Sequence, residues 1–181
     1  KGKLAFTDPA NSGFSYATAS ALLGVWGDND AAWAKLRKLI ANTKVLSRST
    51  LVYDGIGSGE YPLGITLEYA GYLWARNGAP VSVIYPADGT VALAEGAAII
   101  KGDPNSVNAR ALVDYLASKP TQEMLLKATF RRPARQDVAL TDAKGMPPLS
   151  QIKLLPYDDQ KWEAARARTL RKLKDVIQET R

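Results

Sequence analysis

The first candidate site is a short turn, Asn11-Ser12-Gly13-Phe14, which separates a short apolar run from a helical pattern. The first N–H groups of a helix that begins here have no acceptors within that helix. These groups and the positive end of the helix dipole favour an anion, and a glycine lets a ligand approach the backbone. The same residues also form ordinary helix caps and turns, so both interpretations stay open.

A second candidate site is Thr66-Leu67-Glu68-Tyr69, where an apolar strand ends and a helix begins. Glu68 favours the positive end of that helix, and its carboxylate is expected to face the same crevice as Ser12. There it could contact a cation or an amine, while the Tyr69 ring could stack on a ligand or its hydroxyl could donate a hydrogen bond. The alternative is that both residues only stabilise the start of the helix.

Several kinds of chemistry are excluded by composition. The 181 residues contain neither cysteine nor histidine, which excludes disulfides, thiolate nucleophiles and Ser-His-Asp hydrolysis. Asp8, Glu60, Asp88 and Glu95 are scattered and have no helical spacing that would form a metal or general-acid site. The glycine-rich stretch 55–61 lacks the Lys-Ser/Thr of a phosphate loop and precedes a strand instead of following one.

The charge is basic but mixed. The formal net charge is +6, and residues 91–181 hold 16 Lys and Arg against 11 Asp and Glu. A basic face could bind nucleic acid, yet acids lie between the basic residues and no aromatic stacking motif accompanies them. We therefore expect a solvated mixed-charge surface, and structural pairing for Arg131, Arg132 and Arg135 in preference to phosphate binding.

The hydrophobic pattern of the first half alternates between strands and helices, which favours helices that flank a mostly parallel sheet. No run reaches the length needed to span a bilayer, and no signal peptide is visible. The expected strands are 3–6, 44–46, 63–66 and 81–85, and the expected helices are 12–26, one from 30, a short one after 47–50, and 68–77.

The second half has a different character. Two strands are expected at 91–93 and 97–101, followed by a helix from Asn105 that ends at Lys119-Pro120, and by a helix at 121–128. Residues 131–159 are rich in proline and predict an extended arm with short turns. From Asp158 the apolar residues form one stripe of a long amphipathic helix.

The order of these motifs resembles a known family. FTDPANSG, then GEYPLGITLEYAG at 59–71, then YPADGTVALAEGAAIIKGDPN at 85–105 and RRPARQDV together look like the second half of a periplasmic solute-binding protein of an ABC importer. The branch with this pattern includes binders of ferric ion, phosphonates and sugar phosphates. The resemblance covers nearly the whole chain, and residues 59–105 carry its most specific part.

The resemblance implies an α/β fold with three layers, a mostly parallel sheet flanked by helices, as in the second lobe of a type 2 periplasmic-binding fold. Residues 1–85 would form this lobe, and 86–103 would be crossing or hinge strands. Residues 104–181 would be C-terminal helices and an extended arm that belong with the first lobe. That first lobe and a signal peptide are absent, so the resemblance implies a fragment whose uncovered apolar surface binds the missing lobe or another copy of the chain.

The resemblance also assigns ligand-binding residues. The family's anion site lies at a Ser-Gly-x turn at a helix start, which here is Ser12, Gly13 and Phe14. The remaining ligand-binding candidates are Thr66, Glu68 and Tyr69. Ferric binders carry two adjacent tyrosines after the strand that corresponds to 63–66, whereas here Tyr69 is followed by alanine. A phosphate-bearing or similar organic anion is therefore expected ahead of iron.

The leading hypothesis is capture of a small anionic solute for import, with no catalysis, no metal and no cofactor. The expected partners are the solute and the ABC permease at the inner membrane, not nucleic acid. The expected location is periplasmic, or secreted and membrane-tethered as a lipoprotein in a Gram-positive source. The alternatives are ferric-ion transport, a hydrolase or lyase that uses the same cleft with Glu68 or Asp8 as acid or base, and a basic nucleic-acid or partner-binding module.

Overall fold

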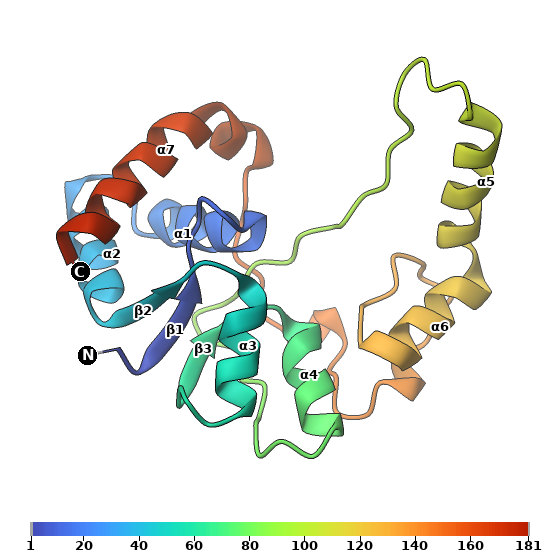
Figure 1. Cartoon of the computed structure of the whole chain (residues 1–181), viewed down its shortest axis with the longest axis horizontal. Coiled ribbons are helices and arrows are strands. Elements are labelled where there is room, and N and C mark those ends of the chain that lie inside the picture. Colours follow the sequence, from blue (N-terminus) through green and yellow to red (C-terminus); the bar gives the residue numbers. More distant parts are fainter. Residues whose placement is uncertain (1, 181) are drawn as a thin grey trace. The chain divides into compact units, whose positions relative to one another are not determined.

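The computed structural model describes residues 2–180, apart from the side chain of Asp142. The chain divides into two compact units (Figure 1). Unit 1 combines residues 1–91 with 152–181, and unit 2 is the intervening segment 92–151. The chain therefore leaves unit 1 after residue 91 and returns to it at residue 152.

The centre of unit 1 is a parallel sheet in the order β2-β1-β3 (Figure 1). Its strands are β1 (Leu4–Thr7), β2 (Thr43–Leu46) and β3 (Leu63–Ile65). Leu4 is paired with both Thr43 and Leu63, which fixes the register. Parallel strands need helical crossovers, so the expectation of a mostly parallel sheet in an α/β fold is confirmed.

Helices cover both faces of this sheet, because alternate residues of a strand point to opposite faces. Phe6 and Ile65 face helices α1 (Gly13–Val25), α2 (Asp30–Ala41) and α7 (Asp159–Thr180). On the opposite face Gly64 lies against Val52 and Ile56 of helix α3 (Ser49–Gly57), where a methyl group would clash. These are the three layers that the sequence predicts.

The main core of unit 1 lies between α1, α2 and α7. Leu23, Leu36 and Leu173 are almost completely buried there, and the Tyr16 hydroxyl donates to the carbonyl of Trp162 at 2.6 Å. The sequence analysis assigned α7 with the rest of 104–181 to a first lobe. In the structure the apolar stripe of α7 packs on α1 and α2.

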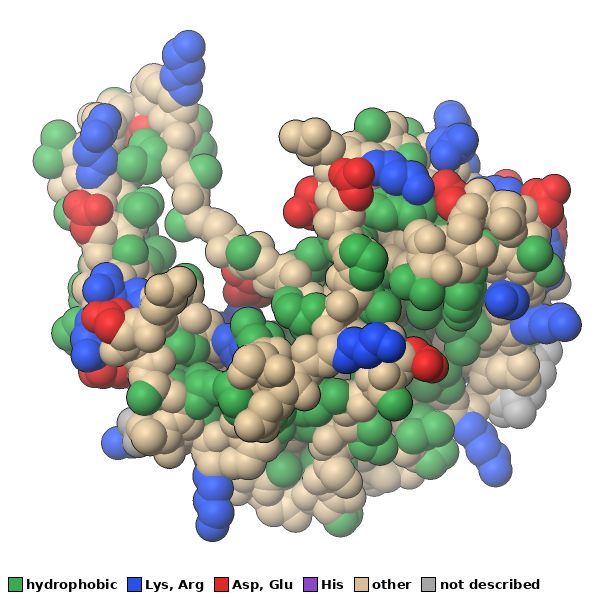
Figure 2. Space-filling view, turned by 180° about the vertical axis from the view of Figure 1, so that it is seen from behind, with side chains coloured by type: hydrophobic (Ala, Val, Ile, Leu, Met, Phe, Trp, Pro, Cys, Tyr) green, Lys and Arg blue, Asp and Glu red, His purple; other side chains and the backbone are tan. Residues whose placement is uncertain are grey.

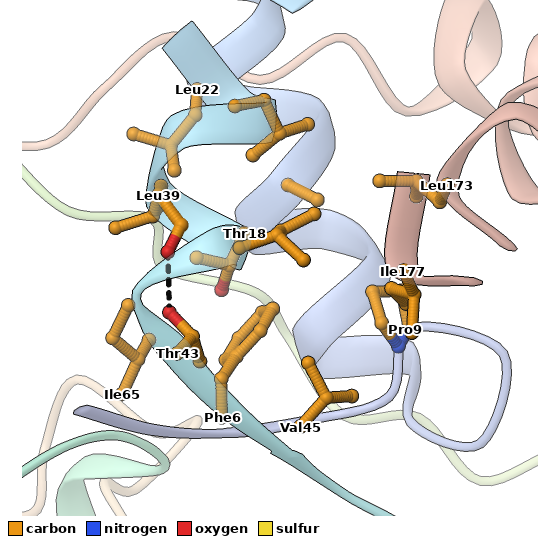
Figure 3. A pocket seen from close by; sticks show the side chains of 13 residues that line it. Phe6, Pro9, Thr18, Leu22, Leu39, Thr43, Val45, Ile65, Leu173 and Ile177 are labelled. Carbon is orange, nitrogen blue, oxygen red and sulfur yellow. Dashed lines mark hydrogen bonds between the residues drawn. The ribbon is translucent and has the colours of Figure 1, made fainter. Parts of the chain in front are cut away.

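Figure 3 shows the small cavity inside this core. Its walls are mainly apolar side chains of β1, β2, β3, α1, α2 and α7, together with Thr18 and Thr43, and its free volume is about 10 Å³. The Thr43 hydroxyl is satisfied there by the carbonyl of Leu39 at 2.7 Å. This space is a packing defect of the core and is too small for a solute.

Helix α4 (Glu68–Arg76) packs beside α3, where Gly57 lies against the ring of Trp74. Residues 81–85 follow without regular secondary structure and not as the predicted strand. The predicted strands 91–93 and 97–101 are also absent from the described residues. Strands need neighbours to satisfy their backbone groups, and in this part of the chain only Thr90 pairs, with Leu154.

Unit 2 contains helices α5 (Ser106–Ala117) and α6 (Lys119–Thr129), followed by an irregular arm with two short 3-10 turns, η1 (Leu140–Asp142) and η2 (Leu149–Gln151). The prediction of an extended arm with short turns is confirmed. The expectation that Lys119-Pro120 ends a helix is half right, because these residues also begin α6. Proline is favourable in the first turn of a helix, where the missing N–H is not needed.

The surface carries interleaved charges. Lys and Arg side chains are spread over the face seen in Figure 2, and acidic side chains lie among them. Cation and anion pairs such as Lys119 with Glu123 and Arg166 with Glu163 contribute to this mixture. Within residues 2–180, no helix combines the length and the apolar composition needed to cross a bilayer.

Candidate functional site

Three segments of unit 1 meet where the parallel strands end. The carboxyl ends of β1, β2 and β3 share one edge of the sheet, and each strand leads there to the start of a helix: α1, α3 or α4. We call the residues from these three strand ends to the first turns of these helices the strand-end edge. Crevices at such edges are where open α/β sheets generally bind ligands.

The turn before α1 has the geometry of an anion site. Ser12 is the N-cap, with extended backbone, and its hydroxyl accepts from the Ser15 N–H at 3.3 Å. Gly13 is exposed, and a methyl group added there would meet nothing within 4 Å. In the described part of the chain, the N–H groups of Gly13 and Phe14 have no acceptor, so both are available to a ligand.

Hydroxyl groups connect this turn to its neighbours. The Thr7 hydroxyl at the end of β1 donates to Ser49 at 3.3 Å, and the Ser49 hydroxyl donates to Ser12 at 3.4 Å. Both contacts are long for O–H···O hydrogen bonds. The three hydroxyls therefore lie together without being strongly committed to one another, and they can turn toward an added acceptor.

Two further hydroxyls at the strand-end edge are buried without a partner. Among the described residues, the Thr66 and Ser15 hydroxyl oxygens are buried and make no hydrogen bond. Thr66 follows β3, and Ser15 is in the first turn of α1. Buried polar atoms are almost always satisfied, so unpaired hydroxyls at this edge are consistent with a group that they would bind.

The Glu68 carboxylate is held by a residue that the sequence analysis missed. The Tyr85 hydroxyl donates to Glu68 Oε1, and the Tyr72 hydroxyl lies 3.2 Å from that of Tyr85. Glu68 is in the first turn of α4, where a negative charge is favourable. The expectation that Glu68 simply faces the crevice is thus sharpened, because one of its oxygens already accepts from Tyr85.

The pKa of Tyr85 leads to a prediction about alkaline stability. Burial, followed by the hydrogen bond to Glu68, raises this pKa above the ordinary 10.0. The folded chain holds the phenol proton more tightly than the unfolded chain, so this stabilisation is present below about pH 10 and is lost as pH rises above it. Tyr85→Phe should therefore lose less stability than wild type between about pH 10 and 11. Urea midpoints of both proteins at these pH values check it, and parallel losses would contradict it.

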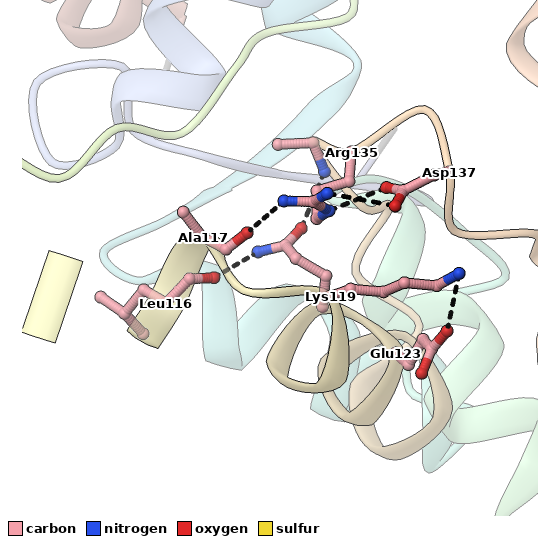
Figure 4. Close-up of polar contacts among 8 residues, drawn as sticks. Leu116, Ala117, Lys119, Glu123, Arg135 and Asp137 are labelled. Carbon is pink, nitrogen blue, oxygen red and sulfur yellow. Dashed lines mark hydrogen bonds and ion pairs between the residues drawn. The ribbon is translucent and has the colours of Figure 1, made fainter. Parts of the chain in front are cut away.

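The arginines of 131–135 are committed to structural contacts inside unit 2. Arg135 contacts both carboxylate oxygens of Asp137 and donates to the Ala117 carbonyl at 3.2 Å (Figure 4). The hydrogen bond between Arg135 and Asp137 raises the pKa of Arg135 and lowers that of Asp137. Arg131 is paired with Glu95, and Arg132 donates to the Pro147 carbonyl. The structural interpretation of these arginines is confirmed.

All six candidate ligand-binding residues lie along the strand-end edge. Ser12, Gly13 and Phe14 follow β1, and Thr66 to Tyr69 follow β3, the neighbour of β1. The sequence analysis placed Ser49 only before a short helix, although the run of hydroxyls after a strand was a usable signal. Nothing in the sequence indicated Tyr85, because it lies 17 residues after Glu68 in a segment that was expected to be a strand.

Acidic clusters that could hold a metal ion are not found in residues 2–180. The polar groups along the strand-end edge are hydroxyls, backbone N–H groups, the Arg48 guanidinium and the carboxylates of Asp8 and Glu68. This set suits an anionic group better than a divalent cation, which prefers several carboxylates.

A family model described as bacterial extracellular solute-binding protein matches residues 1–177. The chain belongs to this family. The bacterial extracellular solute-binding chain is 29% identical over 172 residues to an uncharacterised protein of Haemophilus influenzae, an alignment that covers 93% of the chain.

Solved structures share the fold of this solute-binding chain. The periplasmic binding protein P5PA superposes on 98% of it with a TM-score of 0.83 and 25% identity. Iron-bound HitA from Pseudomonas aeruginosa superposes on 97% of it with a TM-score of 0.79 and 18% identity. The substrate-binding protein of an ABC transporter from Agrobacterium tumefaciens superposes on 97% of it with a TM-score of 0.76 and 22% identity. The expected periplasmic-binding fold is confirmed.

The solute-binding chain spans about half the length of these proteins. It covers 49% of the Haemophilus protein and 57%, 57% and 54% of P5PA, HitA and the Agrobacterium protein. The relatives thus contain about as much additional chain as is present here.

Proposed function

We propose that the chain is part of the solute-binding component of an ABC importer and captures a small anionic solute, phosphate-bearing or similar, at the strand-end edge. The observation that carries this proposal is the start of α1, where the Gly13 and Phe14 N–H groups have no acceptor among the described residues. The hydroxyls of Ser12 and Ser49 lie beside one another there. Family membership and the likeness to an importer's substrate-binding protein support the transport role.

The chemistry of the site is binding without reaction. The two N–H groups and the dipole of α1 would hold the anionic group, and the neighbouring hydroxyls would donate to its remaining oxygens. Thr66 adds a further donor from the end of β3. Glu68 and Tyr69 would contact hydroxyls or a positive group elsewhere on the same solute. Each of these contacts orients the solute, and none activates a nucleophile.

The partner of unit 2 is a lobe that corresponds to the additional chain of the relatives. Helix α5 has no buried residue, and its side chains Val107, Leu112 and Tyr115 are 78%, 57% and 58% exposed. Such an apolar stripe is expected to be covered. We place this lobe on α5, with 86–103 as the connecting region. A second copy of the chain is the competing occupant, and sedimentation at increasing concentration distinguishes it.

The permease of the importer is the second partner that we propose, and the location is the periplasm or, in a Gram-positive source, the outer surface of the membrane through a lipid anchor. Docking to a permease would follow closure on the solute. This order requires that the solute-free chain bind the permease more weakly than the solute-loaded protein.

Iron is less well supported than an anion. HitA shares the fold at 18% identity, which carries no information on the solute. Here Tyr69 is followed by Ala70, and the raised pKa of Tyr85 favours its neutral phenol over the phenolate that ferric ion needs. An anionic solute requires neither a second tyrosine beside Tyr69 nor a phenolate at Tyr85.

A thermal-shift screen tests the proposed function. The probes are inorganic phosphate, glucose 6-phosphate, a phosphonate, ferric citrate and uncharged glucose. The phosphate-bearing probes should raise the melting temperature of the chain, and glucose should not, because stabilisation follows preferential binding to the folded state. If only ferric citrate raised the melting temperature, or if no phosphate-bearing or phosphonate probe did, the assignment would be refuted. Release of phosphate from p-nitrophenyl phosphate would favour an enzyme instead.

A further inference from the structure

Tyr85 lies outside the strand-end edge in sequence but contacts a residue in it. Its hydroxyl donates to Glu68 Oε1 and lies 3.2 Å from the Tyr72 hydroxyl. The ring is only partly exposed, and the pKa of the phenol is raised. Tyr85 is therefore a neutral hydrogen-bond donor to Glu68 at every physiological pH.

The segment that carries Tyr85 is attached to α4 at two further points. Its beginning is fixed by the Ala79 N–H, which donates to the Trp74 carbonyl at 3.1 Å. Its middle is fixed by Val83, whose side chain lies against Gly71 so closely that a Cβ there would be 2.6 Å from Val83 Cγ2. Tyr85 is thus the last of three attachments that hold residues 79–85 along α4.

Beyond Tyr85 the same segment reaches the place where the chain leaves unit 1. The Thr90 N–H donates to the Lys153 carbonyl at 3.0 Å, and the Leu155 N–H donates to the Thr90 carbonyl at 2.8 Å. The outgoing and returning passages of the chain are therefore paired one residue before the boundary at 91 and just after the boundary at 152. Thr90 lies five positions after Tyr85, a contour of at most about 18 Å.

We infer that Tyr85 is a positioning residue, which fixes the Glu68 carboxylate at the strand-end edge and connects it to the segment through which the chain passes out of unit 1. Its consequence for solute selection rests on the proposed function. A solute group that binds Glu68 then acts on the same contacts that hold residues 79–85 along α4, so occupancy of the site changes the freedom of the residues that follow, up to Thr90. The Glu68 carboxylate and the segment that leads to Thr90 are thus coupled, so a change at either one should be measurable at the other.

Amide hydrogen exchange of solute-free protein tests the attachment. Tyr85→Phe removes only the hydroxyl and should speed exchange of peptide 79–91 by about tenfold, since a hydrogen bond to a charged acceptor is lost. Tyr72→Phe is the matched control, because it removes a neighbouring hydroxyl and leaves the contact between Tyr85 and Glu68 in place. Its exchange should stay within about twofold of wild type. Equal exchange in wild type and Tyr85→Phe would overturn the inference.

Variants of Glu68 separate positioning from general loosening. Glu68→Gln keeps a neutral acceptor oxygen, so its exchange rate should lie between those of wild type and Tyr85→Phe, whereas Glu68→Ala should exchange like Tyr85→Phe. The double variant Glu68→Ala/Tyr85→Phe should exchange no faster than either single variant, because both remove the same contact. Additive effects of the two substitutions would show that the residues act separately and would contradict the inference.

Solute affinity distinguishes failure of this inference from failure of the proposed function. Tyr85→Phe should weaken the binding of glucose 6-phosphate by about fivefold and leave the binding of inorganic phosphate unchanged, because only the sugar presents hydroxyls to Glu68. An equal loss for both probes would contradict the positioning role. If neither probe binds wild type, the proposed function fails, and the exchange experiment still decides the role of Tyr85.

Discussion

Replacing Leu173 by alanine is expected to lower the free energy of unfolding of the chain by about 3 to 4 kcal/mol. Leu173 is 1% exposed and lies in the core between α1, α2 and α7. The loss combines the transfer of the removed atoms to water with the cavity left behind, which a close-packed core cannot fill. Urea denaturation followed by tryptophan fluorescence measures it, because Trp162 and Trp33 are in or beside the same core.

The control for this experiment is Lys174→Ala, one residue further along α7 and exposed. It should change the free energy of unfolding by less than about 0.5 kcal/mol. If Leu173→Ala were equally mild, α7 would not be an integral part of unit 1. The helix would then be available to another lobe, as the original assignment of residues 104–181 required.

Replacing Ser12 by aspartate is expected to weaken phosphate binding by about 100-fold while leaving the fold intact. Aspartate is as good an N-cap as serine, so α1 keeps its first turn. Its carboxylate, however, would stand beside the Gly13 and Phe14 N–H groups that we assign to the anion. The two negative charges would repel each other at short range, and the carboxylate would also compete for the free N–H groups.

Asn29→Asp is the matched control for the Ser12 substitution. Asn29 caps α2 through the Ala32 N–H at 3.0 Å, so the change places the same new charge at another helix start of unit 1. That helix does not begin at the strand-end edge, and phosphate affinity should stay within about twofold of wild type. Isothermal titration of both variants with inorganic phosphate provides the comparison. Equal losses would indicate a general effect of charge, and no loss in Ser12→Asp would remove the site from α1.

Local patterns were sufficient to predict most of the fold of unit 1. The helix over 12–26 and the helix from Asp158 agree with α1 and α7 to within one or two residues, because their apolar stripes and capping residues are local features. The partner of an amphipathic stripe is a tertiary property. The stripe of α7 fits α1 and α2, yet nothing within 158–181 distinguishes that partner from a second lobe.

The three predicted strands at 81–85, 91–93 and 97–101 show the opposite situation. Their composition is typical of strands, but a strand exists only when a neighbour accepts its hydrogen bonds. Within the described residues 81–101 only Thr90, which lies outside the three segments, finds such a neighbour. Ile84 and Ile100 are consequently 75% and 78% exposed. Pairing with another lobe would give these segments the conformation that their composition predicts.

The candidate site was predicted in part for the same reasons. Ser12 and Thr66 could be placed from the sequence, since parallel strands bring their following loops to one edge. Tyr85 could not, because its contact with Glu68 depends on how an irregular segment returns along α4. Ser49 could have been included, as its hydroxyl run follows β2 directly. Arg135 was correctly given a structural role, and Asp137 is the partner that explains it.

The most direct test of the central claim is a titration of the isotopically labelled chain with inorganic phosphate, followed by amide nuclear magnetic resonance up to about 10 mM. The proposal predicts saturable shifts of the Gly13 and Phe14 amide signals, with smaller changes at the Ser49 amide. The Asp30 and Ala31 amides at the start of α2 should shift far less, although they too begin a helix. Shifts of equal size at both helix starts, or none at Gly13 and Phe14, would contradict an anion site at the strand-end edge.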